Sequence, residues 1–143
     1  MAELRGHVLH AGMATGTALV LDEPLSFWGG VDPETGRIID QRHPQVGENV
    51  GGRVLVMASG RGSSSSSTVL AETLRAGCGP AAILLREKDE ILVLGALVVA
   101  LLDGRSMPIV QLDAEQYGQL QNGDRVRVLD SGWLEVSSAE NAG

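Results

Sequence analysis

The sequence concentrates its candidate chemistry in one short stretch, where an arginine between two glycines precedes five consecutive serines. Gly60 and Gly62 flank Arg61, and both glycines allow backbone conformations that residues with a Cβ resist. Ser63–Ser67 follow at or near a helix start, where their hydroxyls can accept hydrogen bonds from unpaired backbone N–H groups. Helix-start N–H groups and the positive end of the helix dipole favour negative charge. The pattern therefore predicts a site for an anionic or carboxylate-bearing ligand.

A strand and a helix must position this turn. Val54–Ala58 is a short apolar run with the length and β-branched content of a buried strand. The helix is expected from about Thr68 to Ala76, with Leu70 and Leu74 on one face and Gly77 as its stop signal. A strand, a glycine turn and a helix in this order direct backbone N–H groups toward one point.

The five serines have an alternative interpretation as a flexible, low-complexity linker. A linker would not normally lie between a buried strand and a well-terminated helix that are only a few residues away on either side. The arrangement favours a turn that faces a ligand.

Composition limits the class of protein. The 143 residues are 43% hydrophobic and 20% charged, which is typical of one globular domain, here residues 1–143, with a core that needs no disulfide. Aromatic residues make up only 3%, so the core must consist of Val, Leu, Ile and Ala. The net charge of −7 argues against a nucleic-acid partner or an anionic membrane surface. The longest apolar run, Ile91–Leu102, is too short to span a bilayer.

The single cysteine, Cys78, excludes an intramolecular disulfide and is consistent with a reducing cytoplasm. One cysteine cannot form a multi-cysteine zinc or iron–sulfur site, so we expect no metal or cofactor to be bound by this chain alone. Residues 1–12 lack the continuous apolar stretch of a signal peptide. We expect a cytoplasmic protein.

A long segment rich in proline and glycine, Asp22–Asn49, precedes the central strand, and no regular structure is expected in it. Such loops are often lids or binding loops. Two interpretations are open: a surface loop pinned by a hydrophobic plug, or a segment that packs on a partner or closes over a site, a role in which tryptophan is favoured. Pro44 fixes the residue before it in an extended shape. The candidates for an interface or lid are Phe27, Trp28, Gly29, Gly30, Asp32 and His43.

The remaining pattern predicts an α/β domain with some parallel strand pairing. Ile91–Leu102 is expected to be a strand followed by a helix from about Gly95, buried on all sides. Residues 125–129 and 133–136 are expected to form a hairpin that closes against the amino-terminal strands. Residues 137–143 are expected to be a disordered tail. Further strands are predicted at residues 5–11, 16–21, 81–85 and 108–112.

Four motifs carry a resemblance to a known family. They are SFWGGVDPETGRIID (26–40), HP (43–44), SGRGSSSSS (59–67) and GPAAILL (79–85). Together they resemble the swivel domain of aconitase X, and the resemblance covers residues 6 to 136. It implies the swivelling β/β/α fold of the aconitase superfamily, in a small subunit or domain that docks on a large subunit.

The resemblance also implies a reaction. The large subunit of that family carries an iron–sulfur cluster on cysteines, and the composite enzyme removes water from a hydroxy acid. Bacterial members convert cis-3-hydroxy-L-proline to 1-pyrroline-2-carboxylate, whereas archaeal relatives dehydrate phosphomevalonate. The absence of a phosphate-binding lysine cluster favours the hydroxyproline branch. The isolated chain is expected to be inactive.

By analogy with aconitases, a serine of the swivel domain acts as an alkoxide base, and Ser63 matches the serine of the GRGS element. The substrate contacts would then be Arg61, Gly62, Ser64 and Ser67. Ser67, one helical turn later, is a second candidate for the base, while helix capping is the alternative role for each of Ser64–Ser67. Archaeal relatives have mixed residues after GRGS and this chain has only serines, so the position of the base stays open.

Two rival hypotheses remain. One is a stand-alone ligand-binding or scaffold domain without catalysis. The other is a self-sufficient enzyme with a serine nucleophile, for which the sequence offers no evident His–Asp support.

Overall fold

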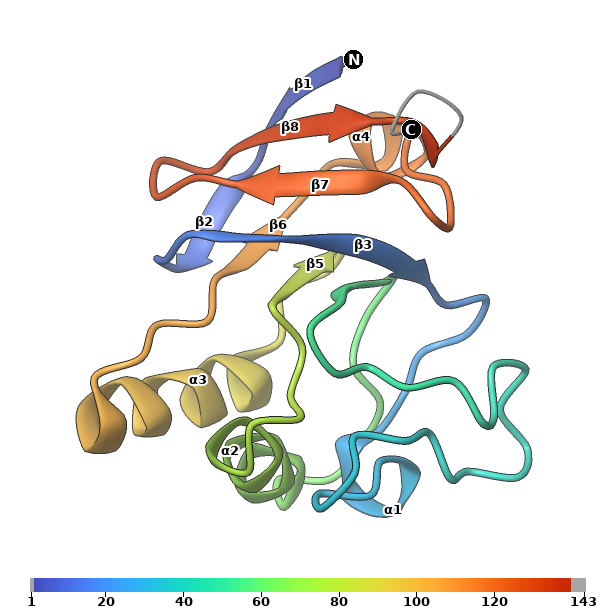
Figure 1. Ribbon diagram of the computed structural model, residues 1–143, viewed down its shortest axis with the longest axis vertical. Coiled ribbons are helices and arrows are strands. Elements are labelled where there is room, and N and C mark those ends of the chain that lie inside the picture. Colours follow the sequence, from blue (N-terminus) through green and yellow to red (C-terminus); the bar gives the residue numbers. More distant parts are fainter. Residues whose placement is uncertain (1, 140–143) are drawn as a thin grey trace.

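The structure, a computed structural model, describes residues 2–139 and contains an eight-stranded mixed sheet (Figure 1). The strands are β1 (Ala2–Arg5), β2 (His7–His10), β3 (Ala14–Val20), β4 (Val54–Met57), β5 (Ala82–Leu85), β6 (Ile109–Gln111), β7 (Arg125–Val128) and β8 (Trp133–Ser137). The helices are α1 (Phe27–Gly30), α2 (Ser66–Arg75), α3 (Glu90–Asp103) and α4 (Ala114–Tyr117).

The strand order is β1-β8-β7-β3-β4-β5-β6-β2. The first half of β3 pairs antiparallel with β7, and its second half pairs parallel with β4. Strands β4, β5 and β6 continue the parallel arrangement, and β2 is antiparallel to β6. The predicted α/β class, the parallel pairing and the closing hairpin β7–β8 are confirmed.

Gly6 allows the sheet to close almost completely. It is the single residue between β1 and β2, which occupy opposite ends of the strand order. A Cβ at Gly6 would collide with the Val110 side chain and lie 2.7 Å from the Gln111 carbonyl oxygen. Only glycine fits this close approach. One short segment therefore serves both edges of the sheet.

Two hydrophobic clusters cover the two faces of the sheet. In β4 the side chains alternate, as the two-residue period of a strand requires: Val54 and Val56 face the cluster enclosed by the curved sheet, and Leu55 and Met57 face α2 and α3. Figure 1 shows α2 and α3 together at one end of the molecule, and strands β7 and β8 of the sheet at the opposite end.

The prediction for Ile91–Leu102 was wrong in two respects. The segment is not a strand followed by a helix but one helix, α3, since the Asp89 carboxylate accepts the Ile91 and Leu92 N–H groups at its start. Nor is it buried on all sides, because several of its leucines are exposed. Among residues 2–139, no helix is long and apolar enough to cross a membrane.

Smaller differences between the prediction and the structure concern where helices and strands begin and end. α2 begins at Ser66, two residues before the predicted start, and β1 and α4 were not predicted. The long segment contains α1 and isolated bridges that pair Val31 with Ile38 and Arg37 with Asn49. Ser137, assigned to a disordered tail, is the last residue of β8, and residues 140–143 of that tail lie outside the described part of the chain.

Candidate active site

The glycine turn between β4 and α2 is fixed on both sides. On one side, Gly60 forms a parallel bridge with Leu25, and the Arg61 N–H donates to the Leu25 carbonyl oxygen over 3.3 Å. On the other side, a Cβ at Gly60 would collide with the carboxylate of Asp89, the residue that caps α3. The turn therefore lies directly against the start of α3, and this close approach requires glycine at position 60.

Ser63 is half-buried at the centre of this turn. Its Oγ accepts the Ser65 N–H over 3.1 Å, and its carbonyl oxygen accepts the Ser66 N–H over 2.9 Å. Gly62 precedes it with φ +92°, a left-handed conformation that favours glycine. The N–H groups of Gly62, Ser63 and Ser64 form no hydrogen bond with the described residues. Consecutive unpaired N–H groups at a helix start bind anions.

This geometry suits Ser63 to the role of a base. A serine hydroxyl is a poor base unless its anion is stabilised, and the Ser65 N–H already points at Oγ from the positive end of α2.

The hydroxyls of the other serines in the run are arranged differently. Ser65 occupies the N-cap position without a side-chain capping bond, and the Ser67 hydroxyl donates to the Ser64 carbonyl oxygen over 2.9 Å. Ser64 is exposed.

The Arg61 guanidinium lies beside the turn. Its Nη2 is 3.8 Å from Glu23 Oε1, and the two side chains are 54% and 49% exposed. An ion pair this long and this exposed contributes little, because solvent screens it. The guanidinium is therefore able to exchange Glu23 for a carboxylate ligand at small cost.

Ser66 is a site residue that sequence reasoning missed. It is only 4% exposed, and its Oγ accepts the Trp28 N–H over 3.1 Å and lies 3.2 Å from Ser26 Oγ. The Ser26 hydroxyl in turn contacts the Trp28 carbonyl oxygen over 3.0 Å. The signal for this residue was helical periodicity, since Ser66 precedes Leu70 by four residues and shares its buried face.

The aromatic segment is divided between core and surface. Phe27, one of the candidates for the interface or lid, is fully buried and packs in the core. Trp28 is 58% exposed, and Gly29 next to it has φ +75°. Gly30 is buried. Phe27 thus anchors the segment while Trp28 extends from it beside the serine turn.

Asp32 and His43 hold the long segment together. The Asp32 carboxylate accepts the Glu34 N–H over 2.9 Å. His43 is buried; its Nδ1 accepts the Gln45 N–H over 3.0 Å, so its Nε2 donates to the Glu23 carbonyl oxygen at 3.0 Å. These contacts lie within the segment and fix the backbone that carries Glu23.

The pocket at the turn is small. It measures about 10 Å³, which is room for about one water molecule, and its lining includes Phe27, Arg61, Ser63, Ser66 and Leu92. A ring-sized ligand at Ser63 would therefore lie largely outside this chain's surface, and a second surface would be needed to enclose it.

Comparison with known proteins identifies the family. Residues 3–136 match the family described as "Aconitase X swivel domain". The chain belongs to this family. Among solved structures, this chain, called the swivel domain below, is similar to a chain of aconitase X from Thermococcus kodakaraensis in its holo-form. The two are 33% identical in sequence with a TM-score of 0.86, and the match covers 96% of this chain and 100% of that one. The predicted fold of a swivelling domain of the aconitase superfamily is confirmed.

Curated relatives of the swivel domain include dehydratases of two kinds. Cis-3-hydroxy-L-proline dehydratase of Pseudomonas aeruginosa is 48% identical over 128 residues, which are 90% of this chain and 22% of that protein. The chain thus spans about a fifth of the length of this relative. The phosphomevalonate dehydratase small subunit of Methanosarcina acetivorans is 34% identical over 136 residues, covering 94% of this chain and 90% of that one.

The residues of the swivel domain do not fit an iron–sulfur cluster. Within residues 2–139, no group of three or more His, Cys, Asp or Glu side chains is placed to hold a metal ion. Cys78 Sγ instead lies 3.3 Å from the Pro33 carbonyl oxygen and 3.6 Å from that of Thr73.

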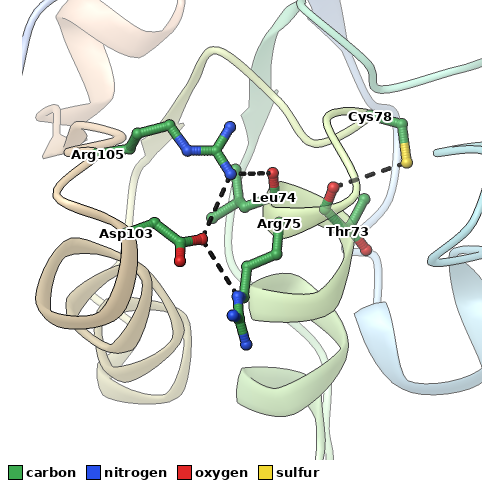
Figure 2. A network of polar contacts seen from close by, with 6 residues as sticks. All are labelled: Thr73, Leu74, Arg75, Cys78, Asp103 and Arg105. Carbon is green, nitrogen blue, oxygen red and sulfur yellow. Dashed lines mark hydrogen bonds and ion pairs between the residues drawn. The ribbon is translucent and has the colours of Figure 1, made fainter.

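The opposite end of α2 is closed by a polar network (Figure 2). Asp103 Oδ2 lies 3.2 Å from Arg75 Nε and 3.5 Å from Arg105 Nη2, which also donates to the Leu74 carbonyl oxygen over 3.0 Å. A guanidinium here satisfies a terminal carbonyl group and complements the negative end of the helix dipole. Arg105 therefore joins the ends of α2 and α3 and is remote from the serine turn.

Proposed function

We propose that this chain is the small, swivelling part of an aconitase X-type dehydratase and supplies the base that removes a proton from a small hydroxy acid. The observation that carries this proposal is the position of Ser63. Its Oγ accepts an N–H group at the start of α2, directly after the Gly-Arg-Gly sequence, in a chain of the aconitase X swivel domain family.

The substrate that we propose is cis-3-hydroxy-L-proline, since the Pseudomonas and Hypocrea jecorina enzymes of that name are 48% and 43% identical to this chain over the matched regions. The proton on C2, beside the carboxylate, would pass to Ser63 Oγ. The 3-hydroxyl would leave and depart as water after taking up one proton. The resulting C2–C3 enamine then loses the proton on nitrogen and gains one on C3, so that the double bond moves to C2–N and the products are 1-pyrroline-2-carboxylate and one water.

Arg61 would bind the substrate carboxylate. Its present partner, Glu23, is 3.8 Å away and exposed, so a better-placed carboxylate can replace it. The unpaired N–H groups of Gly62, Ser63 and Ser64 supply further donors on the same turn. Ser67 would have a weaker role, because its hydroxyl donates its proton in a hydrogen bond to the Ser64 carbonyl oxygen.

We further propose that the chain is inactive alone and acts in the cytoplasm with a large aconitase X-type partner that holds the iron–sulfur cluster. The small pocket at Ser63 supports this division, since the turn offers half of an enclosed site. Trp28 lies beside the turn and is exposed, which suits it to contact the partner or cover the substrate.

A second candidate substrate is phosphomevalonate. It is favoured by the share of the relatives' length that this chain covers, and not by the sequence identity. The small subunits named for phosphomevalonate dehydratase match this chain over nearly their whole length, for example 90% of the Methanosarcina acetivorans protein. The same turn chemistry would serve that dehydration. A stand-alone binding domain is the alternative without catalysis.

The test is to purify the chain with the large aconitase X-type polypeptide of the same organism and to assay loss of cis-3-hydroxy-L-proline. Turnover by the pair and by neither chain alone is the expected result. A stable pair that turns over only phosphomevalonate would overturn the proposed substrate. A stable pair without any dehydratase activity would overturn the catalytic role.

A further inference from the structure

One face of α3 exposes an uninterrupted row of leucines. Figure 1 shows α3 on the outside of the molecule, beside α2. Residues 91–102 contain no charged or polar side chain. The leucine face consists of Leu94, Leu97, Leu101 and Leu102, which are 51%, 43%, 76% and 63% exposed. Their spacing of three, four and one residues places them along one side of a helix.

This face is not needed for the internal packing of the domain. The opposite side of α3 already packs in the core through Leu92, Ala96 and Val99. Gly95 brings α3 close to α2, since a Cβ there would lie 2.8 Å from the Ser67 carbonyl oxygen. A helix of a soluble domain normally places polar residues on its outer side, and a run of exposed leucines is typical of a surface that another protein covers.

A groove connects the leucine face to the serine turn. It measures about 450 Å³ and lies between α2 and α3. Ala71, Leu94 and Val98 supply its apolar lining, Glu72 and Arg75 are its charged residues, and Ser67 stands at its end nearest the turn. Ser67 follows Ser63 by four residues, so a surface that encloses a ligand at Ser63 lies next to the start of this groove.

We propose that the leucine face and the α2–α3 groove form the docking surface for the large catalytic partner, so that one contact both covers the leucines and completes the site at Ser63. This inference rests on the proposed function, and it names helices rather than the Trp28 segment as the main contact. The large partner is the expected occupant because the groove ends at Ser67, next to the serine turn, and because relatives of this chain are named as small subunits. In the Pseudomonas protein the matched region is 22% of the chain, so the same domain there belongs to a much longer polypeptide.

The experiment compares three forms of the chain for binding to the large polypeptide of the same organism. The test variant carries Leu94→Gln and Leu101→Gln, which remove two exposed leucines and keep residues with good helix propensity. The matched control is Trp133→Gln, which replaces a 39% exposed apolar residue of β8, a strand that lies across the molecule from α2 and α3 (Figure 1). The dissociation constant is measured by titration calorimetry, and the thermal midpoint of each isolated chain checks its folding.

The test variant should raise the dissociation constant by about 100-fold or more, since each leucine buried at an interface contributes substantially to binding. The control should stay within about threefold of wild type. Equal affinity of the test variant and wild type overturns the inference, as does failure of the wild-type pair to associate. A wild-type dimer that the test variant abolishes while heteromeric binding persists also overturns it and assigns the face to a second copy.

Binding and turnover are read separately. A wild-type pair that binds through the leucine face and shows no dehydration contradicts the proposed reaction and leaves the docking surface supported. A pair that dehydrates cis-3-hydroxy-L-proline and whose association is unaffected by the leucine substitutions supports the proposed reaction and contradicts the docking surface.

Discussion

The backbone N–H of Trp28 donates a hydrogen bond to the buried Oγ of Ser66 over 3.1 Å. This bond connects the aromatic segment, which follows β3, to the first residue of α2, which follows β4. The two chain segments that meet at the candidate site therefore share one side-chain anchor. Ser63 and Trp28 are placed relative to each other through Ser66.

Replacing Ser66 should release the aromatic segment. Ser66→Ala removes the acceptor of the Trp28 N–H and should lower the free energy of unfolding by about 1–2 kcal/mol. Denaturant unfolding measures the loss, and Trp28 fluorescence in a Trp133→Phe background reports on the segment directly. Ser67→Ala is the control, since its hydroxyl contacts only the Ser64 carbonyl oxygen, and it should change stability by less than about 0.5 kcal/mol. Equal losses in the two variants would contradict the anchor.

Ser63 should be essential for turnover and dispensable for folding. In the complex with the large partner, Ser63→Ala should lower kcat by about 10²- to 10⁴-fold, the usual contribution of a positioned base. Assembly, measured by gel filtration, should stay unchanged, because the hydrogen bond that the Ser63 side chain accepts comes from the Ser65 N–H of the same turn. Ser67→Ala distinguishes the second candidate and should keep most of the activity. Near-normal turnover by Ser63→Ala would sink the assignment.

Gly60 should tolerate no side chain. Gly60→Ala places a methyl group against the Asp89 carboxylate that caps α3, and relief of the collision must shift the turn or weaken the cap. We expect a loss of about 1–3 kcal/mol in the free energy of unfolding. Gly118→Ala is the matched control, since its Cβ would lie 3.3 Å from the Ala114 carbonyl oxygen and its φ is negative. A harmless Gly60→Ala would mean that the turn does not lie against α3.

Asp113 should make the domain sensitive to acid. The Gln116 N–H, which Asp113 Oδ1 accepts at the start of α4, lowers the pKa of this carboxyl below its ordinary value of 3.8. A carboxyl with a depressed pKa in the folded state stabilises the fold above its ordinary pKa, and that contribution is lost as the pH falls through the folded value. Asp113→Asn keeps a capping oxygen without the titration.

The measurement for Asp113 is the thermal midpoint of the two proteins between pH 6 and pH 2. The difference in thermal midpoint between wild type and Asp113→Asn should be constant above about pH 5, and wild type should lose stability relative to the variant as the pH falls further. Parallel curves over the whole range would contradict the linkage.

The sequence predicted the parts of the site that depend on local pattern. The strand before Gly60, the turn at Arg61 and the stop at Gly77 follow from residue types a few positions apart. The family followed from motifs and is confirmed over residues 3–136. The inward position of Ser66 was missed because helical periodicity identifies it only when the helix is known to begin at Ser66, whereas the sequence placed that start at about Thr68.

Tertiary context decided what the pattern left ambiguous. An apolar run such as Ile91–Leu102 fits a buried strand or a helix equally well, and the Asp89 cap selects the helix. Its exposed leucines depart from the prediction that the run is buried on all sides, and such a row of exposed leucines is what the docking surface proposed above requires. His43 shows the converse: a polar residue proposed for a lid is buried among backbone partners.

The closing strand of the sheet has a mechanical consequence. Ala2 pairs with Val136, so the polypeptide enters and leaves the domain at neighbouring points on one edge, about 5 Å apart. Figure 1 shows this edge on the far side of the molecule from α2 and α3. A tether attached at either end would thus hold the domain by a single pivot, and α2, across the molecule from that edge, would travel further than the neighbouring strands for a given rotation.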